Sequence, residues 1–373
     1  MKRTIDIELS LQPGIDAVPP QYGDPYKQAC TGDGITIETW RKTWTDNYKF
    51  THDRFGSLGD NSVGQLYGIN RHRPCVVVGS GPSLKDAIPA LVKNKLQPNP
   101  VTTISCLHNF GYFEDEGCHS DYYITLDAGD IVLDDVWQGR KHPAEYYWEK
   151  TKDKILLASA VTPPKLFDAW KGKVYLFNIL LPDLPLRQEF AKVEVFNHYI
   201  SCGGNALGGC VYLAKTLFGS GEIIIVGGDF CFGYTHQFHS YETPYDNIKG
   251  KGVGNVIRWP DIYGISRVTW PSYLNFKFWF DWLTLNIPGR WSSASEGIFG
   301  SYPEGNLKSV RYGILENLLE TYQTADVLNI GEYQFVNGVM SPKVDEKGVM
   351  IKTPKLVSEI WKDPKQPMEI TFF

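Results

Sequence analysis

A series of short apolar runs, separated by segments of helix length, constrains the fold of this chain more than any other feature. The runs are Cys75–Val78, Val101–Cys106, Tyr122–Leu126, Lys154–Ala158, Val174–Phe177, Val193–Phe196 and Glu222–Val226. Strands that alternate with helices need crossover connections, which make the strands parallel and place helices on both faces of the sheet. The sequence therefore predicts an α/β fold built on a mainly parallel sheet.

The 373 residues divide into three regions that differ in composition and hydrophobic pattern. Residues 1–73 are rich in Pro, Gly, Asp and Thr and predict an N-terminal extension, whereas residues 74–246 hold the alternating pattern and predict the α/β core. Residues 247–373 are helical and aromatic and predict a C-terminal α+β subdomain. Helices are expected in the flanking regions over Thr36–Phe50, Ser272–Asn286 and Ser309–Tyr322.

Composition excludes several classes of protein. The net charge of −5 argues against a general nucleic-acid-binding surface. No apolar run has transmembrane length, and the polar N-terminus lacks the apolar core of a signal peptide. Several of the seven cysteines lie inside apolar runs, so we expect reduced, buried thiols in a cytoplasmic protein. The aromatic content of 14% is typical of cores or of subunit contacts and leaves a homo-oligomer open.

The first apolar run ends in a short glycine-rich turn that precedes a helical pattern. The turn consists of Gly79, Ser80, Gly81, Pro82 and Ser83. Glycine lets the backbone bend sharply, and free N–H groups at a helix N-terminus favour an anion, so the turn predicts a site for a nucleotide phosphate. The spacing is neither Gly-x-Gly-x-x-Gly, since Leu84 replaces the third glycine, nor a Walker loop. An ordinary strand-to-helix turn is the alternative.

Two further glycine-rich segments follow later in the chain. One contains Ser201, Gly203, Gly204 and Asn205. It precedes a helical pattern for which Asn205 is a natural N-cap, and close helix packing is the other use of its glycines. The second follows the run Glu222–Val226 and contains Gly228, Asp229 and Phe230. At the end of a buried strand, Asp229 is placed to bind a ribose, a metal or an acceptor hydroxyl, or to cap the next turn.

Candidate catalytic side chains lie near the ends of other expected strands. His236 and His239 carry imidazoles suited to general acid–base catalysis, and their spacing also permits metal ligation, although no third ligand is evident. Asp127 and Asp130 follow the run Tyr122–Leu126. They are suited equally to holding Mg²⁺ on a diphosphate and to capping the turn. Asn109 follows the preceding run.

Taken together, these segments resemble the motility accessory factor family, which shares a domain with 6-hydroxymethylpterin pyrophosphokinase-like proteins. They also resemble the bacterial CMP-sialic-acid sialyltransferases with a single Rossmann-like domain. The motifs that carry the resemblance are Gly-Ser-Gly-Pro-Ser-Leu at 79–84, Asn109, Asp127, Gly-Gly-Asn at 203–205, and Gly-Gly-Asp-Phe at 227–230 with a histidine after it. The resemblance covers roughly residues 74–300. It implies a Rossmann-like fold and a nucleotide-sugar transferase with no obligatory metal or other cofactor.

The sialyltransferase pattern also implies roles for individual residues. The turn from Gly79 to Ser83 would contact the nucleotide and its phosphate, and Asn109 would hold the donor. The Ser201–Asn205 turn would touch the nucleotide, and Asp229 and Phe230 would lie beneath the cytidine.

The chain departs from that pattern at the catalytic base. No histidine lies in Ile262–Trp270, where the sialyltransferases place theirs, and Cys231 and Phe232 stand where donor-binding tyrosines are expected. His239 instead matches a histidine of the motility accessory factors. Glu296 lies in a segment similar to that family's Thr-Glu-Gly-Gly turn, which implies contact with the acceptor sugar.

Three functions remain open on this basis. The sequence predicts a glycosyltransferase that moves a nonulosonic (sialic-acid-type) sugar from a CMP-linked donor to a hydroxyl of a protein or glycan, with His239 or Asp127 as the base. The first alternative is an ATP- and Mg²⁺-dependent diphosphotransferase acting on a pterin, for which Asp127 and Asp130 would be the carboxylates. The second is a non-catalytic binding or assembly protein that retains the fold.

Overall fold

A computed structural model describes residues 23–56, 61–179, 199–200, 202–233, 239, 256–287, 289–323, 333–336 and 339–342. The chain divides into two compact units, Met1–Leu315 and Glu316–Phe373. In the second unit, β12 (Tyr333–Val336) and β13 (Val339–Pro342) form an antiparallel pair. The first unit contains the main sheet and the candidate site.

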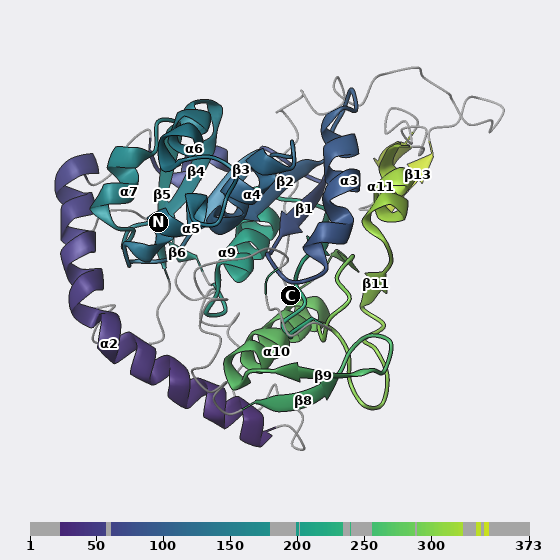
Figure 1. The fold of residues 1–373 in the computed structure, drawn as a ribbon. Helices are drawn as coiled ribbons and strands as arrows, with labels where there is room; N and C mark the ends of the chain where they lie inside the picture. Colours follow the sequence, from purple (N-terminus) through teal and green to yellow (C-terminus); the bar gives the residue numbers. More distant parts are fainter. Residues whose placement is uncertain are drawn as a thin grey trace. The chain divides into compact units, whose positions relative to one another are not determined.

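A nine-stranded sheet in the order β11-β10-β7-β1-β2-β3-β4-β5-β6 forms the centre of the first unit (Figure 1). All of its neighbouring strands are parallel. The strands are β1 (Pro74–Val78), β2 (Thr102–Cys106), β3 (Tyr122–Thr125), β4 (Ile155–Ser159), β5 (Lys173–Ile179), β6 (Tyr199–Ile200), β7 (Glu222–Val226), β10 (Arg290–Ser293) and β11 (Val310–Tyr312). The predicted α/β fold is confirmed, and every expected run forms a strand except Val193–Phe196, which lies outside the described residues.

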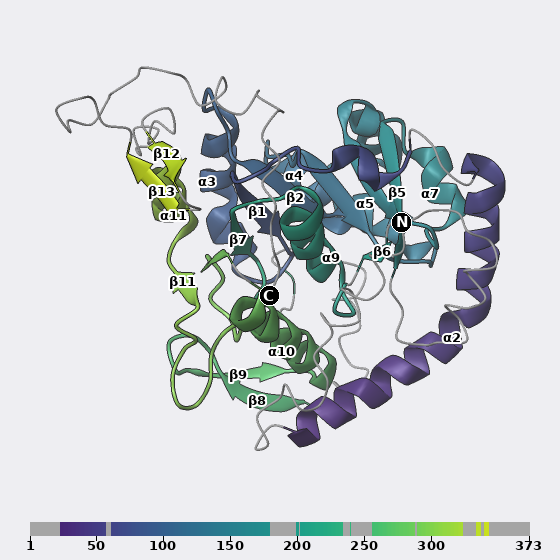
Figure 2. The ribbon, with the colours of Figure 1, turned by 180° about the vertical axis from the view of Figure 1, so that it is seen from behind.

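Both faces of the sheet are covered. On one face, α9 (Ala206–Tyr212), its π-helical continuation η6 (Leu213–Leu217) and α10 (Pro271–Asn286) share a core with alternate strand residues such as Cys75 and Val77. Figure 2 shows α9 in front of the strands. Val76 and Val78 alternate with those residues along β1, so they point to the opposite face, and they too are fully buried.

The remaining elements connect the strands or precede them. They are α2 (Gly23–Phe55), η3 (Val63–Leu66), α3 (Leu84–Lys95), η4 (Leu107–Asn109), α4 (Phe110–Asp115), α5 (Ile131–Trp137), α6 (Ala144–Lys150), η5 (Thr151–Asp153), α7 (Pro164–Ala169), β8 (Ile257–Pro260), β9 (Ser266–Thr269) and α11 (Leu315–Gln323). None of the helices in the described part of the chain combines the length and hydrophobicity that a bilayer crossing requires.

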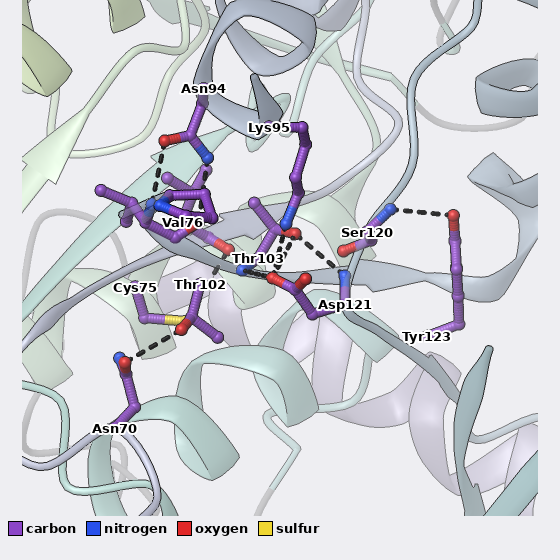
Figure 3. Close-up of polar contacts among 12 residues, drawn as sticks. Asn70, Cys75, Val76, Asn94, Lys95, Thr102, Thr103, Ser120, Asp121 and Tyr123 are labelled. Atoms are coloured by element: carbon purple, nitrogen blue, oxygen red, sulfur yellow. Dashed lines mark hydrogen bonds and ion pairs between the residues drawn. The ribbon is translucent and has the colours of Figure 1, made fainter. Parts of the chain in front are cut away.

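Polar side chains fix the amino-terminal edge of β1, β2 and β3 (Figure 3). Asp121 accepts hydrogen bonds from the backbone N–H and the hydroxyl of Thr103, at 2.8 and 3.1 Å, and forms an ion pair with Lys95 at 2.5 Å. Asn94 bonds both the N–H and the C=O of Val101 at 2.9 Å. These bonds anchor the end of α3 to β2 and set the β2–β3 register. The glycine-rich loops lie at the opposite, carboxyl edge of the sheet.

Two expected helices differ from those observed. α2 is 33 residues long and extends well beyond the predicted Thr36–Phe50. The helix predicted over Ser309–Tyr322 is wrong at its start, because Val310–Tyr312 forms β11 and the helix begins at Leu315. Val310 pairs with Trp291 of β10. Strand pairing with a distant segment outweighs the local helical pattern there.

The cysteines whose side chains are described are all buried and unpaired, as predicted. Four of them, Cys75, Cys106, Cys202 and Cys210, belong to the core beneath α9. Burial raises the pKa of the Cys210 thiol, so this side chain acts as a small apolar group.

Candidate functional site

The order of the strands reverses between β1 and β7. The chain leaves β1 toward β2 on one side and leaves β7 toward β10 on the other. In parallel α/β sheets, ligands bind outside the carboxyl ends of the strands at such a switch point. The first predicted glycine-rich turn follows β1 and the third follows β7, so the structure brings these two loops together at this point.

The two loops pack backbone against backbone. Gly79 N–H donates to the Val226 carbonyl at 2.8 Å, and Gly81 N–H donates to the Gly227 carbonyl at 2.9 Å. A Cβ atom on Gly79 or Gly81 would approach the Gly227 oxygen to 2.5 or 2.7 Å, closer than real Cβ atoms come. These glycines are therefore required for close packing of the loops, whatever else the loops bind.

The carboxylate of Asp229 lies at the amino end of α3. The residue is 3% exposed. Its Oδ2 accepts from Ser83 N–H at 2.9 Å, and its Oδ1 accepts from the Ser83 hydroxyl at 2.8 Å and from Glu296 N–H at 3.1 Å. Burial raises the pKa of the Asp229 carboxyl, and the bonds from Ser83 and Glu296 oppose that shift. The anion expected at this helix terminus is thus supplied by the protein itself.

The turn after β10 completes the contacts of the β7 loop. Ser295 Oγ accepts from Gly228 N–H at 2.8 Å, and Ile298 N–H donates to the Asp229 carbonyl at 2.8 Å. The Glu296 side chain is exposed above this contact. Phe230 adopts a positive φ of 52°, a backbone conformation that is strained for a phenylalanine. Its carbonyl accepts from the Thr269 hydroxyl at 2.5 Å, which holds the loop in this form.

The second glycine-rich segment is a packing turn beneath α10. Asn205 is the N-cap of α9, with its Oδ1 accepting from Gly208 N–H at 2.9 Å, as predicted. Gly203 and Gly204 have φ values of 57° and 82°. A Cβ on Gly204 would lie 2.7 Å from the Phe276 ring, and one on Gly203 would clash with Trp279. Ser201 and His236 lie outside the described residues.

Asn109 connects the ends of β1 and β2. The side chain is fully buried. Its Nδ2 donates to the Gly79 carbonyl at 3.0 Å and to Ser105 Oγ at 2.9 Å. Asn109 therefore shapes the loop that begins at Gly79, and direct contact with a donor stays a prediction.

A serine and two histidines meet beside this loop. Ser80 Oγ lies 2.5 Å from His108 Nε2, and the ring of His239 stands edge-on to that of His108 with 5.6 Å between centroids. Burial lowers the pKa of His108 to about 3, with repulsion from His239 and then Arg140 adding to the shift. His108 is therefore a neutral imidazole at physiological pH.

Two aspartates follow the next strand, β3. Asp127 is solvent-exposed, yet desolvation by the surrounding protein raises the pKa of its carboxyl. Asp135 in α5 is 6% exposed, and its Oδ1 has no hydrogen-bond partner among the described residues. Burial raises the pKa of Asp135 to about 7; Asp127 and Asp134 add repulsion, and Arg140 opposes the shift.

These side chains form one electrostatic cluster, since Arg140 acts on both His108 and Asp135, and Asp127 acts on Asp135. We call Ser80, His108, His239, Asp127, Asp135 and Arg140 the edge cluster. Asp130 is outside it, because its exposed carboxylate forms an ion pair with Lys165. Within the described ranges, no three His, Cys, Asp or Glu side chains are placed to hold a metal ion.

Asp135 and Arg140 are missing from the sequence-based prediction of the site. A signal for Asp135 was present, because it shares the buried face of α5 with Val132 and Val136, three and one positions away. A carboxylate on an apolar helix face is unusual unless it is paired or functional. The Ser80–His108 contact had no such signal, since it joins residues 28 positions apart.

Comparison with known proteins places the chain in a family. No curated protein matches it. A solved structure with a similar fold is the MAf glycosyltransferase from Magnetospirillum magneticum AMB-1, at 15% sequence identity and a TM-score of 0.48, covering 71% of this chain and 40% of that one. The chain thus spans well under two thirds of that protein. A family model described as 6-hydroxymethylpterin diphosphokinase MptE-like matches residues 42–235. This match covers just over half of the chain and agrees with the family resemblance seen in the sequence. The protein therefore belongs to the 6-hydroxymethylpterin diphosphokinase MptE-like family.

Proposed function

We propose that the chain is a transferase that moves a nonulosonic sugar from a CMP-linked donor to the hydroxyl of an acceptor protein or glycan. The observation that supports this most is the edge cluster, which brings Asp127 and His239 to the carboxyl ends of β1 to β3 beside the switch point. A base in a partly desolvated position suits removal of a proton from a hydroxyl.

The reaction that we propose is a single displacement. The acceptor oxygen attacks the anomeric carbon, the bond from that carbon to the phosphate oxygen breaks, and CMP leaves with the electron pair. The acceptor proton passes to His239 or Asp127. A carboxyl whose pKa is raised, as desolvation by the surrounding protein does for Asp127, is a stronger base than an ordinary aspartate.

On the donor side, the proposal uses the loop from Gly79 to Ser83 and the Ser201–Asn205 turn. Asp229 acts on the donor through Ser83, because its carboxylate is already engaged by that residue. Glu296 is exposed and stays a candidate for contact with the acceptor. The division into an extension over 1–73, a core over 74–246 and a completing region over 247–373 is part of the same proposal, as is a cytoplasmic location.

Diphosphate transfer from ATP to a pterin is the second candidate. It is favoured by the family description and by the two neighbouring carboxyls of the edge cluster. Asp127 and Asp135 would then be the residues to hold Mg²⁺, since Asp135 Oδ1 lacks a partner among the described residues. Bound there, the ion would neutralise charge on the transferred phosphates.

Equilibrium titration with CMP, CDP, UDP and ATP, each with and without Mg²⁺, separates the candidates. CMP binding without metal supports glycosyl transfer, whereas ATP binding only with Mg²⁺ overturns it in favour of diphosphate transfer. Failure to bind any nucleotide supports the non-catalytic assembly protein.

Variants then test the base. We expect His239→Ala or Asp127→Asn to lower turnover by about 10²- to 10⁴-fold with unchanged nucleotide affinity. Asp130→Asn is the matched control, because this carboxylate is paired with Lys165 outside the edge cluster. Full turnover in both test variants contradicts the assignment of the base.

A further inference from the structure

The second half of α2 contacts the loops that end β3 and β4. Asn47 is 8% exposed, and its Nδ2 donates to the Ala128 carbonyl and to the Val161 carbonyl, each at 2.9 Å. Ala128 directly follows Asp127, and Val161 lies just beyond β4. One amide group therefore joins two neighbouring loops at the carboxyl edge of the sheet.

A second contact from α2 falls on the same loop. A Cβ atom on Gly129 would lie 2.8 Å from the Trp40 ring, so the indole rests directly on this glycine. Trp40 and Asn47 are two turns apart on α2, close to one face of the helix. Both residues that follow Asp127 are thus held from α2.

The end of α2 is itself fixed to the body of the first unit. The rings of Phe55 and Phe167 meet edge-to-face at 5.1 Å, and Arg54 forms an ion pair with Asp168 at 2.5 Å. Phe167 and Asp168 belong to α7, which α2 passes in both views (Figures 1 and 2). α2 also contacts α10. A helix anchored in this way can hold a loop in place.

The bonds of Asn47 matter because a buried carbonyl that loses its partner costs about 1–3 kcal/mol. The Ala128 and Val161 carbonyls lie past the strand ends, where the regular ladder of the sheet no longer supplies donors. Without the Asn47 amide, the loop after β3 would move to find water. The carboxylate of Asp127 would move with it.

We propose that Asn47 is a positioning residue for the edge cluster: it holds the backbone after β3 so that the Asp127 carboxylate stays at the carboxyl edge of the sheet. The effect on catalysis rests on the proposed function, whereas the effect on the loop does not. The second half of α2 then supports the site, and the N-terminal segment contributes to catalysis by positioning Asp127.

Hydrogen exchange of the full chain tests the structural half. We expect Asn47→Ala to raise amide exchange over residues 127–131 by about tenfold and to leave β1 and α3 unchanged. Asn47→Asp keeps the shape but sets a carboxylate against two carbonyls, so we expect it to act at least as strongly. Thr45→Ala is the matched control, because its hydroxyl donates to the Arg41 carbonyl within α2 at 3.0 Å.

Kinetics test the catalytic half. For Asn47→Ala we expect kcat to fall by about 10- to 100-fold, with donor KM and nucleotide affinity within about twofold of wild type. If Asn47→Ala does not fold, Gly129→Ala perturbs the same loop by pressing on Trp40. Unchanged exchange over 127–131 in the folded variants overturns the proposal. Faster exchange in a protein whose wild type transfers no sugar overturns only the proposed function.

Discussion

The carboxylate of Asp229 accepts both the backbone N–H and the hydroxyl of Ser83, at 2.9 and 2.8 Å, across the switch point of the sheet. The pair ties the loop after β7 to the first turn of α3. The amino end of α3 therefore already faces a carboxylate of the protein.

We predict that this pair is strongly coupled. Asp229→Asn should lower the free energy of unfolding by about 2–4 kcal/mol, since an amide cannot accept all three bonds. Ser83→Ala should cost about 1 kcal/mol. Because both variants remove the bond from the Ser83 hydroxyl, the double variant should cost less than the sum of the singles by up to about 1 kcal/mol. Urea denaturation measures all three, and additive effects would show that the two residues act independently.

Gly81 should be among the least replaceable positions in the loop. A Cβ there would lie 2.7 Å from the Gly227 oxygen, which is backbone and cannot rotate away. We expect Gly81→Ala to cost about 3 kcal/mol or more in unfolding free energy. Gly117→Ala is the control, with a φ of 66° but no described atom within 4 Å of the added carbon. It should cost about 1 kcal/mol. Equal losses at the two sites would refute close packing as the reason for Gly81.

Asp135 should make the protein less stable as pH rises. Its pKa is about 7 in the folded chain and about 3.9 when unfolded, so the folded state holds the extra proton between these values. Unfolding free energy should therefore fall from pH 4 to pH 7 and stay low above. Asp135→Asn removes the ionisation and should be more stable than wild type at pH 8, by on the order of 4 kcal/mol as an upper bound.

Thermal or urea unfolding at several pH values checks this. The charged groups that act on Asp135 are Asp127, Asp134 and Arg140, so all three must be kept in the variant. Asp130→Asn serves as the exposed control and should show no such gain. A wild type and an Asp135→Asn variant with parallel pH profiles would exclude a buried, protonated Asp135.

The ion pair between Lys277 and Asp281 inside α10 should behave as a unit. Both side chains are buried, and the Lys277 ammonium lies 3.8 Å from the centre of the Tyr302 ring and 5.1 Å from that of Trp259. Burial lowers the pKa of Lys277, and Asp281 opposes that shift. Lys277→Met or Asp281→Asn alone should cost about 3–5 kcal/mol, by leaving one buried charge unpaired.

The double variant Lys277→Met/Asp281→Asn should recover most of that loss, since no uncompensated charge remains. Chemical denaturation of the single and double variants measures the recovery. A double variant as unstable as the sum of the singles would mean that packing, not charge, dominates this site.

Patterns within one segment predicted much of this structure. The apolar runs from Cys75 to Val226, apart from the untested Val193–Phe196, predicted strands of the sheet, and Asn205 predicted the start of α9. Burial and capping are decided by neighbours in the sequence. β11 was missed because it is three residues long and depends on β10. The use of Asp229 as a cap for α3 likewise could not be predicted from the sequence, since it joins residues 146 positions apart.

Asn47 recognises only main-chain oxygens in the two loops that it joins. Nothing in those two bonds depends on which side chains stand at positions 128 and 161, because every residue offers the same carbonyl. Mutation can therefore alter the side chains of these loops while the backbone that carries Asp127 is retained.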